Sequence, residues 1–226
     1  MIKKLSYRTA LLCGCIGALL TLIGDILIGA NPACNITTGV AMLDMFVGAA
    51  KNSDLRMAIG GLIGAIGIPI TGIGYMQIYR HFKDHKGIMP KVYQISTFAY
   101  MTLAGAGVHL PCAVIPLLYE WIAGTDEQLA IQVAEKYANY FMMPLMAIFG
   151  CLLLAALVYQ TIIILKGKTS FSKRAALYNM AIGVVISYIL AAVIGDNIIG
   201  NAIGTGAISI GHLYMFMMFM IDRPKD

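Results

Sequence analysis

The segment VIGDNIIGNAIGTGAISIGHLYMFMMF, residues 193–219, reads as the end of one apolar helix followed by the whole of another. Apolar helices of this length are typical of membrane spans, because a bilayer core about 30 Å thick takes about 20 helical residues. The same segment carries four polar side chains in its apolar frame, Asp196, Asn197, Asn201 and His212. Such groups are costly inside lipid, so they are the first candidates for function.

Composition extends this interpretation to the whole chain. Of its 226 residues, 59% are hydrophobic and 12% are charged, whereas a soluble domain carries about 25% charged residues. Mean hydropathy is +0.80. We therefore predict an all-α, polytopic membrane helix bundle that forms a single domain over residues 1–226. Its six transmembrane helices are expected at 9–30, 55–79, 92–121, 139–165, 175–198 and 202–221.

The net charge of +5 is explained by topology. Thirteen of the 16 Lys and Arg residues fall in alternate connections or at the chain ends; the other three are Lys51, Arg56 and Lys136. This positive-inside pattern predicts that both termini are cytoplasmic, with the connections at 31–54, 122–138 and a tight 198–202 turn outside. It argues against a nucleic acid partner. The five cysteines show no disulfide or zinc spacing, so we expect no metal and no cofactor.

Three stretches predict local structure. TDEQLAIQVAEKYANYF opens with Thr125 and Gln128 in capping-box spacing, which predicts an amphipathic helix leading into the fourth span, bent near Pro144. Residues 37–50, TTGVAMLDMFVGAA, are apolar but too short to span, so they indicate an interfacial or re-entrant helix or a surface connector. The second span presents small residues on one face, which predicts close helix packing; they are Gly60, Gly64, Gly67 and Thr71.

Five ionisable side chains interrupt the apolar spans: Asp25, His109, Glu120, Asp196 and His212. Counting about 1.5 Å per residue places them in the outer half of the bundle. Both aspartates lie near outward helix C-termini, where burial and the helix dipole favour the neutral acid. Three alternatives stay open: aspartates solvated among the headgroups, histidines in structural interhelical hydrogen bonds, and an interfacial Glu120.

The two aspartates share a local frame, LIGDILIGAN at 22–31 and VIGDNIIGNA at 193–202. Gly195-Asp196, then Gly204, Gly206 and Ser209, then Gly211-His212-Leu213-Tyr214, resembles the lysoplasmalogenase-like (YhhN-type) membrane family. The resemblance implies an intramembrane lipid hydrolase that cleaves the vinyl ether of a lysolipid, with Asp25 and Asp196 as the catalytic pair. One carboxyl would protonate the vinyl carbon, and the other would orient water, as paired carboxylates do in glycosidases.

Three functions therefore remain open. The first is this hydrolase, acting in a polar cavity of the outer leaflet half on a membrane lipid or small amphipathic substrate. Residues expected to bind that substrate are His109, His212, Asn31, Asn197, Asn201, Tyr214 and Glu120.

The second is a small proton-coupled transporter, which requires polar residues through the inner half, where Gln77, Thr161 and Ser187 are the candidates. The third is a non-catalytic binding or assembly protein. We expect a location in the bacterial plasma membrane and leave a homo-oligomer open.

Overall fold

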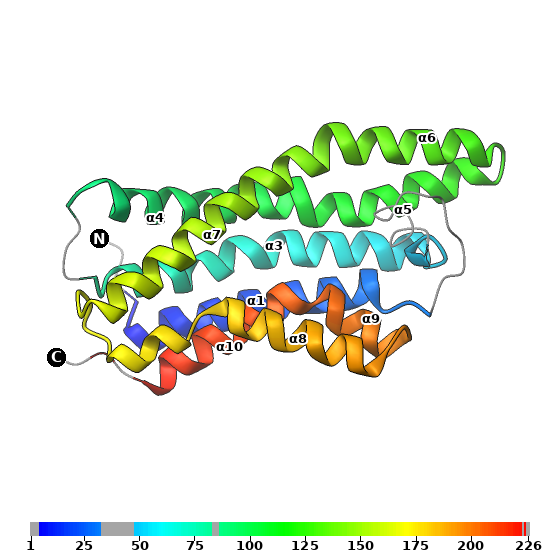
Figure 1. Ribbon diagram of the computed structural model, residues 1–226. Helices are drawn as coiled ribbons and strands as arrows, with labels where there is room; N and C mark the ends of the chain where they lie inside the picture. The colour runs from blue at the N-terminus through cyan, green and yellow to red at the C-terminus, as the bar shows by residue number, and fades with distance from the viewer. Residues whose placement is uncertain (1–4, 33–47, 83–85, 223, 225–226) are drawn as a thin grey trace.

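The computed structural model describes residues 5–32, 48–82, 86–222 and 224, and within these ranges the protein is all-α (Figure 1). One isolated β-bridge, between Phe82 and Thr169, joins two connections. The helices, in chain order, are α1 (Tyr7–Gly29), α3 (Asp54–Tyr79), α4 (Ile88–Ala99), the π-helical η1 (Tyr100–His109), α5 (Leu110–Ala123), α6 (Glu127–Tyr137), the π-helical η2 (Ala138–Met142), α7 (Met143–Leu165), the 3₁₀ helix η3 (Lys173–Leu177), α8 (Met180–Ile194), α9 (Ile198–Thr205) and α10 (Ala207–Ile221).

Four helical segments are long and apolar enough to cross a membrane: Tyr7–Gly29, Asp54–Tyr79, Ile88–Ala123 and Glu127–Leu165. The pair α9 and α10, bent by 61°, makes a fifth if it counts as one broken span. The predicted span at 175–198 corresponds to α8, which has only 15 residues. By length and composition, the described residues therefore supply four to five candidate spans, compatible with an integral membrane protein.

The predicted turn at 198–202 is wrong, because these residues form the start of α9. The chain turns earlier, at Gly195, whose φ of +85° is a conformation that glycine adopts without steric cost. Asn197 then caps α9, since its Oδ1 accepts hydrogen bonds from the backbone N–H groups of Ile199 and Gly200. The predicted last span at 202–221 is consequently two helices, which meet at Gly206.

The helix before the fourth span is present, but its N-cap is Asp126 and not Thr125. Asp126 Oδ1 accepts the backbone N–H of Leu129 at 3.0 Å. Near Pro144, where a bend was predicted, the helix continues, and the π-helical η2 lies just before the proline. The predicted interfacial segment at 37–50 lies outside the described residues, except for its last three.

The small-residue face of α3 packs directly against α1, which confirms the predicted close packing. A Cβ added to Gly67 would lie 2.6 Å from the Gly17 carbonyl oxygen and 2.6 Å from Thr21 Oγ1. A Cβ on Gly17 would in turn overlap the backbone of Thr71. Glycine on both helices therefore lets the two backbones touch, as is common in membrane bundles.

The other helices pack on both sides of the α1–α3 pair (Figure 1). α10 contacts α1 and α8, while η1 and α5 contact α3. α1 begins and α10 ends at the same end of the bundle, where Tyr7 Oη donates to the Phe219 carbonyl at 2.7 Å. Large apolar side chains remain exposed along the outer faces, as in Leu62 (56%) and Leu154 (62%). An apolar exterior of this kind suits a lipid environment.

Candidate functional site

Asp25 is buried where α1, η1 and α10 meet, and it has two side-chain partners. Ser209 Oγ on α10 donates to Asp25 Oδ2 at 2.6 Å. His109 Nδ1, at the end of η1, lies 3.2 Å from Asp25 Oδ1. All three residues are less than 10% exposed. We refer to Asp25, His109 and Ser209 as the buried triad; the order of contacts places the carboxylate between the histidine and the serine.

Glycines on two helices make the space for the His109 ring. A Cβ on Gly64 would overlap the imidazole, and a Cβ on Gly24 would approach its Nε2 to 3.0 Å. His109 Nε2 lies 3.1 Å from the Gly60 carbonyl oxygen, which fixes the ring plane. The glycines predicted for helix packing thus have a second effect, which sequence reasoning missed: they admit a polar ring to the helix interface.

The contacts of His109 determine how many protons the pair holds. The Gly60 carbonyl can only accept, so Nε2 must carry a hydrogen. The contact between Nδ1 and Asp25 Oδ1 needs one more hydrogen, on either the nitrogen or the oxygen. Both arrangements, imidazolium with carboxylate or imidazole with carboxylic acid, are electrically neutral overall. Neutrality lowers the cost of burying the pair, and one proton sits between two atoms that can each hold it.

The π-helical geometry of η1 contributes to the position of His109. The N–H of Leu110 bonds to the Gly105 carbonyl, five residues back, and Pro111 follows with no N–H to donate. A proline ring also clashes with the preceding turn of a regular α-helix, and widening that turn relieves the clash. His109 therefore lies at the end of the π-helical segment, against Gly60 and Gly64 of α3.

Arg56 neutralises the end of α1 beyond Asp25. Its Nε donates to the Leu27 carbonyl at 2.7 Å, and its Nη2 donates to the Ala30 carbonyl at 2.9 Å. A cation at a helix C-terminus offsets the negative end of the dipole. The sequence contained a signal for this role, since Arg56 is one of three basic residues outside the predicted cytoplasmic set.

Asp196 has a different environment. It is exposed, just beyond the end of α8, and Asn201 Nδ2 donates to its Oδ1 at 2.8 Å. The same Asn201 amide donates to the Asn31 carbonyl at 3.0 Å. The two aspartates thus have separate side-chain partners, and the fold presents one buried carboxyl and one exposed carboxyl. An open pocket of about 530 Å³ is lined by Pro32, Asp196, Asn197, Ile198 and Ile199.

His212 is fully buried. It lies on the same face of α10 as Ser209, which precedes it by three residues. Its Nδ1 lies 2.8 Å from the Ile208 carbonyl oxygen and must donate to it, while Nε2 has no hydrogen-bond partner among the described residues. The ring centroid lies 5.0 Å from that of Tyr100 and 5.5 Å from that of Tyr75. His212 therefore offers an unused acceptor in the interior of the bundle.

Buried polar groups continue from His212 toward the end where α1 begins. The Tyr75 and Tyr93 ring centroids are 6.5 Å apart, and Tyr93 Oη donates to Gln160 Oε1 at 3.0 Å. Gln77, nearer that end, accepts from Arg80 Nη1 at 3.0 Å. We call the set from His212 to this end the inner polar column; its members are Tyr75, Gln77, Tyr93, Tyr100, Gln160 and His212. The sequence suggested Gln77 but gave no sign that Tyr93 and Gln160 pair.

The remaining predicted site residues have other contacts. Glu120 is exposed at the end of α5 and interacts with Asp54. Tyr214 Oη donates to the Leu177 carbonyl at 3.1 Å, and Asn197 acts as the cap of α9. Asn31 Nδ2 donates to the Ile28 carbonyl. In the described part of the chain, no third metal-ligating side chain joins Asp25 and His109 in a group that could hold a metal ion.

The whole chain matches one protein family. The model of DUF6796, described as a family of unknown function, covers residues 1–225, and the chain belongs to this family. Comparison with curated proteins and with solved structures returns no similar protein. The buried triad is therefore the main guide to what this DUF6796 member does.

Proposed function

We propose that this protein is a proton-coupled membrane transporter in which the buried triad takes up and releases a proton. In this proposal it is a six-span protein with both termini in the cytoplasm, in the bacterial plasma membrane. The alternation of basic connections supports this orientation. So does the position of the start of α1 and the end of α10 at one end of the bundle.

The observation that carries the proposal is the buried contact between Asp25 Oδ1 and His109 Nδ1, which lie 3.2 Å apart. Carboxylate and histidine pairs inside membrane spans are typical of proton relays. Moving the proton between Nδ1 and Oδ1 leaves the pair neutral, but removing it leaves a net negative charge beside Ser209. A charge change in a buried site is costly, so it can drive a rearrangement of the helices around it.

The inner polar column supports transport over an enclosed structural role. Transport requires polar groups on both sides of the central site. The column extends from the region of the triad toward the end of the bundle where α1 begins. The column begins at His212, whose Nε2 has no hydrogen-bond partner among the described residues and can accept a hydrogen bond from water. Tyrosine rotation and intervening water would complete the steps between its members.

The experiment is proton movement in liposomes. Purified protein is reconstituted with a pH-sensitive dye inside, and a membrane potential is applied with and without a panel of small amphipathic solutes. We expect wild-type flux to be lost in Asp25→Asn and His109→Gln and kept in Asp196→Asn, which removes an exposed carboxylate. Equal flux in all three variants and wild type, or no flux with any solute from folded protein, contradicts the proposal.

A second candidate is the lysolipid hydrolase, supported by the sequence resemblance and by the pocket beside Asp196. That pocket has mainly apolar walls with one carboxylate and could admit an acyl or alkenyl chain. Asn31 and Asn201 would then orient the head group, and Asp196 would protonate the vinyl carbon or activate water.

Incubation with lysolipids, including a 1-alkenyl one, followed by mass spectrometry of the products, tests this candidate. Turnover that Asp25→Asn and Asp196→Asn both abolish would favour it over transport. Absence of both flux and turnover in folded wild-type protein would favour a binding or assembly role.

A further inference from the structure

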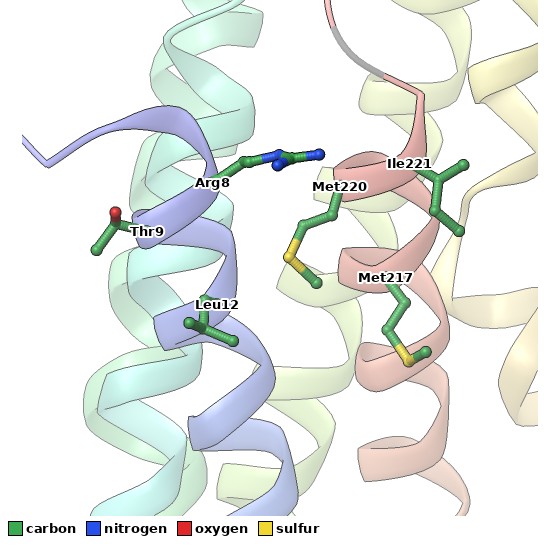
Figure 2. A pocket seen from close by; sticks show the side chains of 6 residues that line it. All are labelled: Arg8, Thr9, Leu12, Met217, Met220 and Ile221. Carbon is green, nitrogen blue, oxygen red and sulfur yellow. The ribbon is translucent and has the colours of Figure 1, made fainter.

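A groove lies between α1 and α10 at the end of the bundle where α1 begins (Figure 2). Its volume is about 650 Å³, and it is open along one side. Its lining residues are Arg8, Thr9 and Leu12 from α1 and Met217, Met220 and Ile221 from α10. The groove is separate from the buried triad, because none of its lining residues belongs to the triad.

Among the described residues that line it, the groove combines an apolar floor with the Arg8 cation at its mouth. Leu12, Met217 and Ile221 are 51%, 53% and 74% exposed, so their apolar surface lacks a protein partner. Figure 2 shows the Arg8 side chain extending from α1 toward α10. Within residues 5–222, outside the two undescribed gaps, no carboxylate lies within ion-pairing distance of Arg8. The nearby Asp222 is instead paired with Arg174.

The walls of the groove are held at a fixed spacing. At the mouth, Tyr7 Oη donates to the Phe219 carbonyl and ties the start of α1 to the end of α10. Behind the floor, the Phe216 ring fills the space left by two glycines, since a Cβ on Gly14 would lie 3.1 Å from it and one on Gly74 2.5 Å. A groove braced in this way is present before any ligand binds, which lowers the ordering cost of binding.

We infer that this groove binds one anionic phospholipid. The phosphate would sit on the Arg8 guanidinium, whose planar fork matches a phosphate. An acyl chain would lie along Leu12, Met217 and Ile221. The charge at the mouth favours an anionic lipid over a zwitterionic one, which carries no net negative charge. The apolar floor favours a lipid over a soluble phosphate, which has no acyl chain. Basic pockets between membrane helices bind anionic headgroups by the same means.

The test compares lipid retention in native mass spectrometry of detergent-purified protein. Phosphatidylglycerol and phosphatidylcholine with identical chains are added at equal concentration, with glycerol phosphate as a soluble probe. We expect wild type to retain one phosphatidylglycerol in preference to phosphatidylcholine. Arg8→Gln should weaken that retention about fivefold, which corresponds to about 1 kcal/mol for one basic residue near a headgroup. Arg8→Lys should restore part of it.

Lys91→Gln is the matched control, because Lys91 is an exposed cation near the start of α4 and outside the groove. It should leave retention unchanged. Equal loss in Arg8→Gln and Lys91→Gln would mean diffuse attraction and overturn the inference, as would equal retention of both lipids. Binding of glycerol phosphate as strong as that of the lipid would overturn it too. Leu12→Trp, which fills the floor and keeps Arg8, should also expel the lipid.

Discussion

Substituting Gly64 by alanine should break the contact between His109 and Asp25. The three atoms nearest to the added methyl group all belong to the His109 imidazole, and the methyl would overlap them. The His109 ring has no free space to move into, because Gly60 of α3 and Gly24 of α1 already lie against it. We expect the imidazole to be displaced from both its partners.

The magnitude follows from what is left behind. A single added methyl in a packed interior costs about 1–3 kcal/mol when neighbours can shift. Here the shift separates a buried carboxyl from its partner, and breaking a buried pair from one side costs about 3–5 kcal/mol. Since the Ser209 hydroxyl still donates to Asp25, we expect a loss of about 3 kcal/mol in the free energy of unfolding.

The assay is helix content during unfolding by a denaturing detergent, which gives the free energy of unfolding in micelles. Gly150→Ala is the matched control, because Gly150 also lies within a helix but has nothing within 4 Å of the new methyl. It should change stability by less than about 1 kcal/mol. In a His109→Ala background, Gly64→Ala should likewise cost less than about 1 kcal/mol, since the ring is gone. A loss as large in that background as in wild type would refute the steric argument.

Three further predictions concern the ends of helices. Asn197→Ala should cost about 1 kcal/mol in the same unfolding assay, because it removes the cap of α9; an unchanged midpoint would contradict that role. Arg56→Gln should cost about 2–3 kcal/mol, since two carbonyls of α1 lose a charged donor, and Lys51→Gln, which removes a charge just before α3, should not. Burial raises the pKa of Asp222, but hydrogen bonds from Ser172 and Arg174 outweigh it and hold the pKa below its usual value. Its stabilisation is therefore complete above about pH 4 and lost as the pH falls through the lowered value, so Asp222→Asn should flatten the acid limb of an unfolding titration.

The two aspartate frames illustrate where sequence reasoning succeeded and where it failed. LIGDILIGAN and VIGDNIIGNA align residue by residue, yet Asp25 lies inside α1 and Asp196 lies beyond the end of α8. The chain turns at Gly195, and the next differing position begins a new helix: Ile26 continues α1, whereas Asn197 caps α9. The capping preference of asparagine was available from the sequence, but the apolar run favoured a span that continued past Asp196 and Asn197 to residue 198.

Composition and hydropathy are enough to establish the class of this protein. A chain with 59% hydrophobic residues in runs of span length forms apolar helices. Asp25, His109 and His212 are unusual in such runs, because polar groups there are costly. Only the tertiary structure decided which of them meet. Ser209 reaches Asp25 from 184 positions away, and His109 reaches it through space that glycines leave open. Burial cost depends on composition along one helix, whereas a hydrogen bond depends on atoms brought within about 3 Å by the packing of several helices.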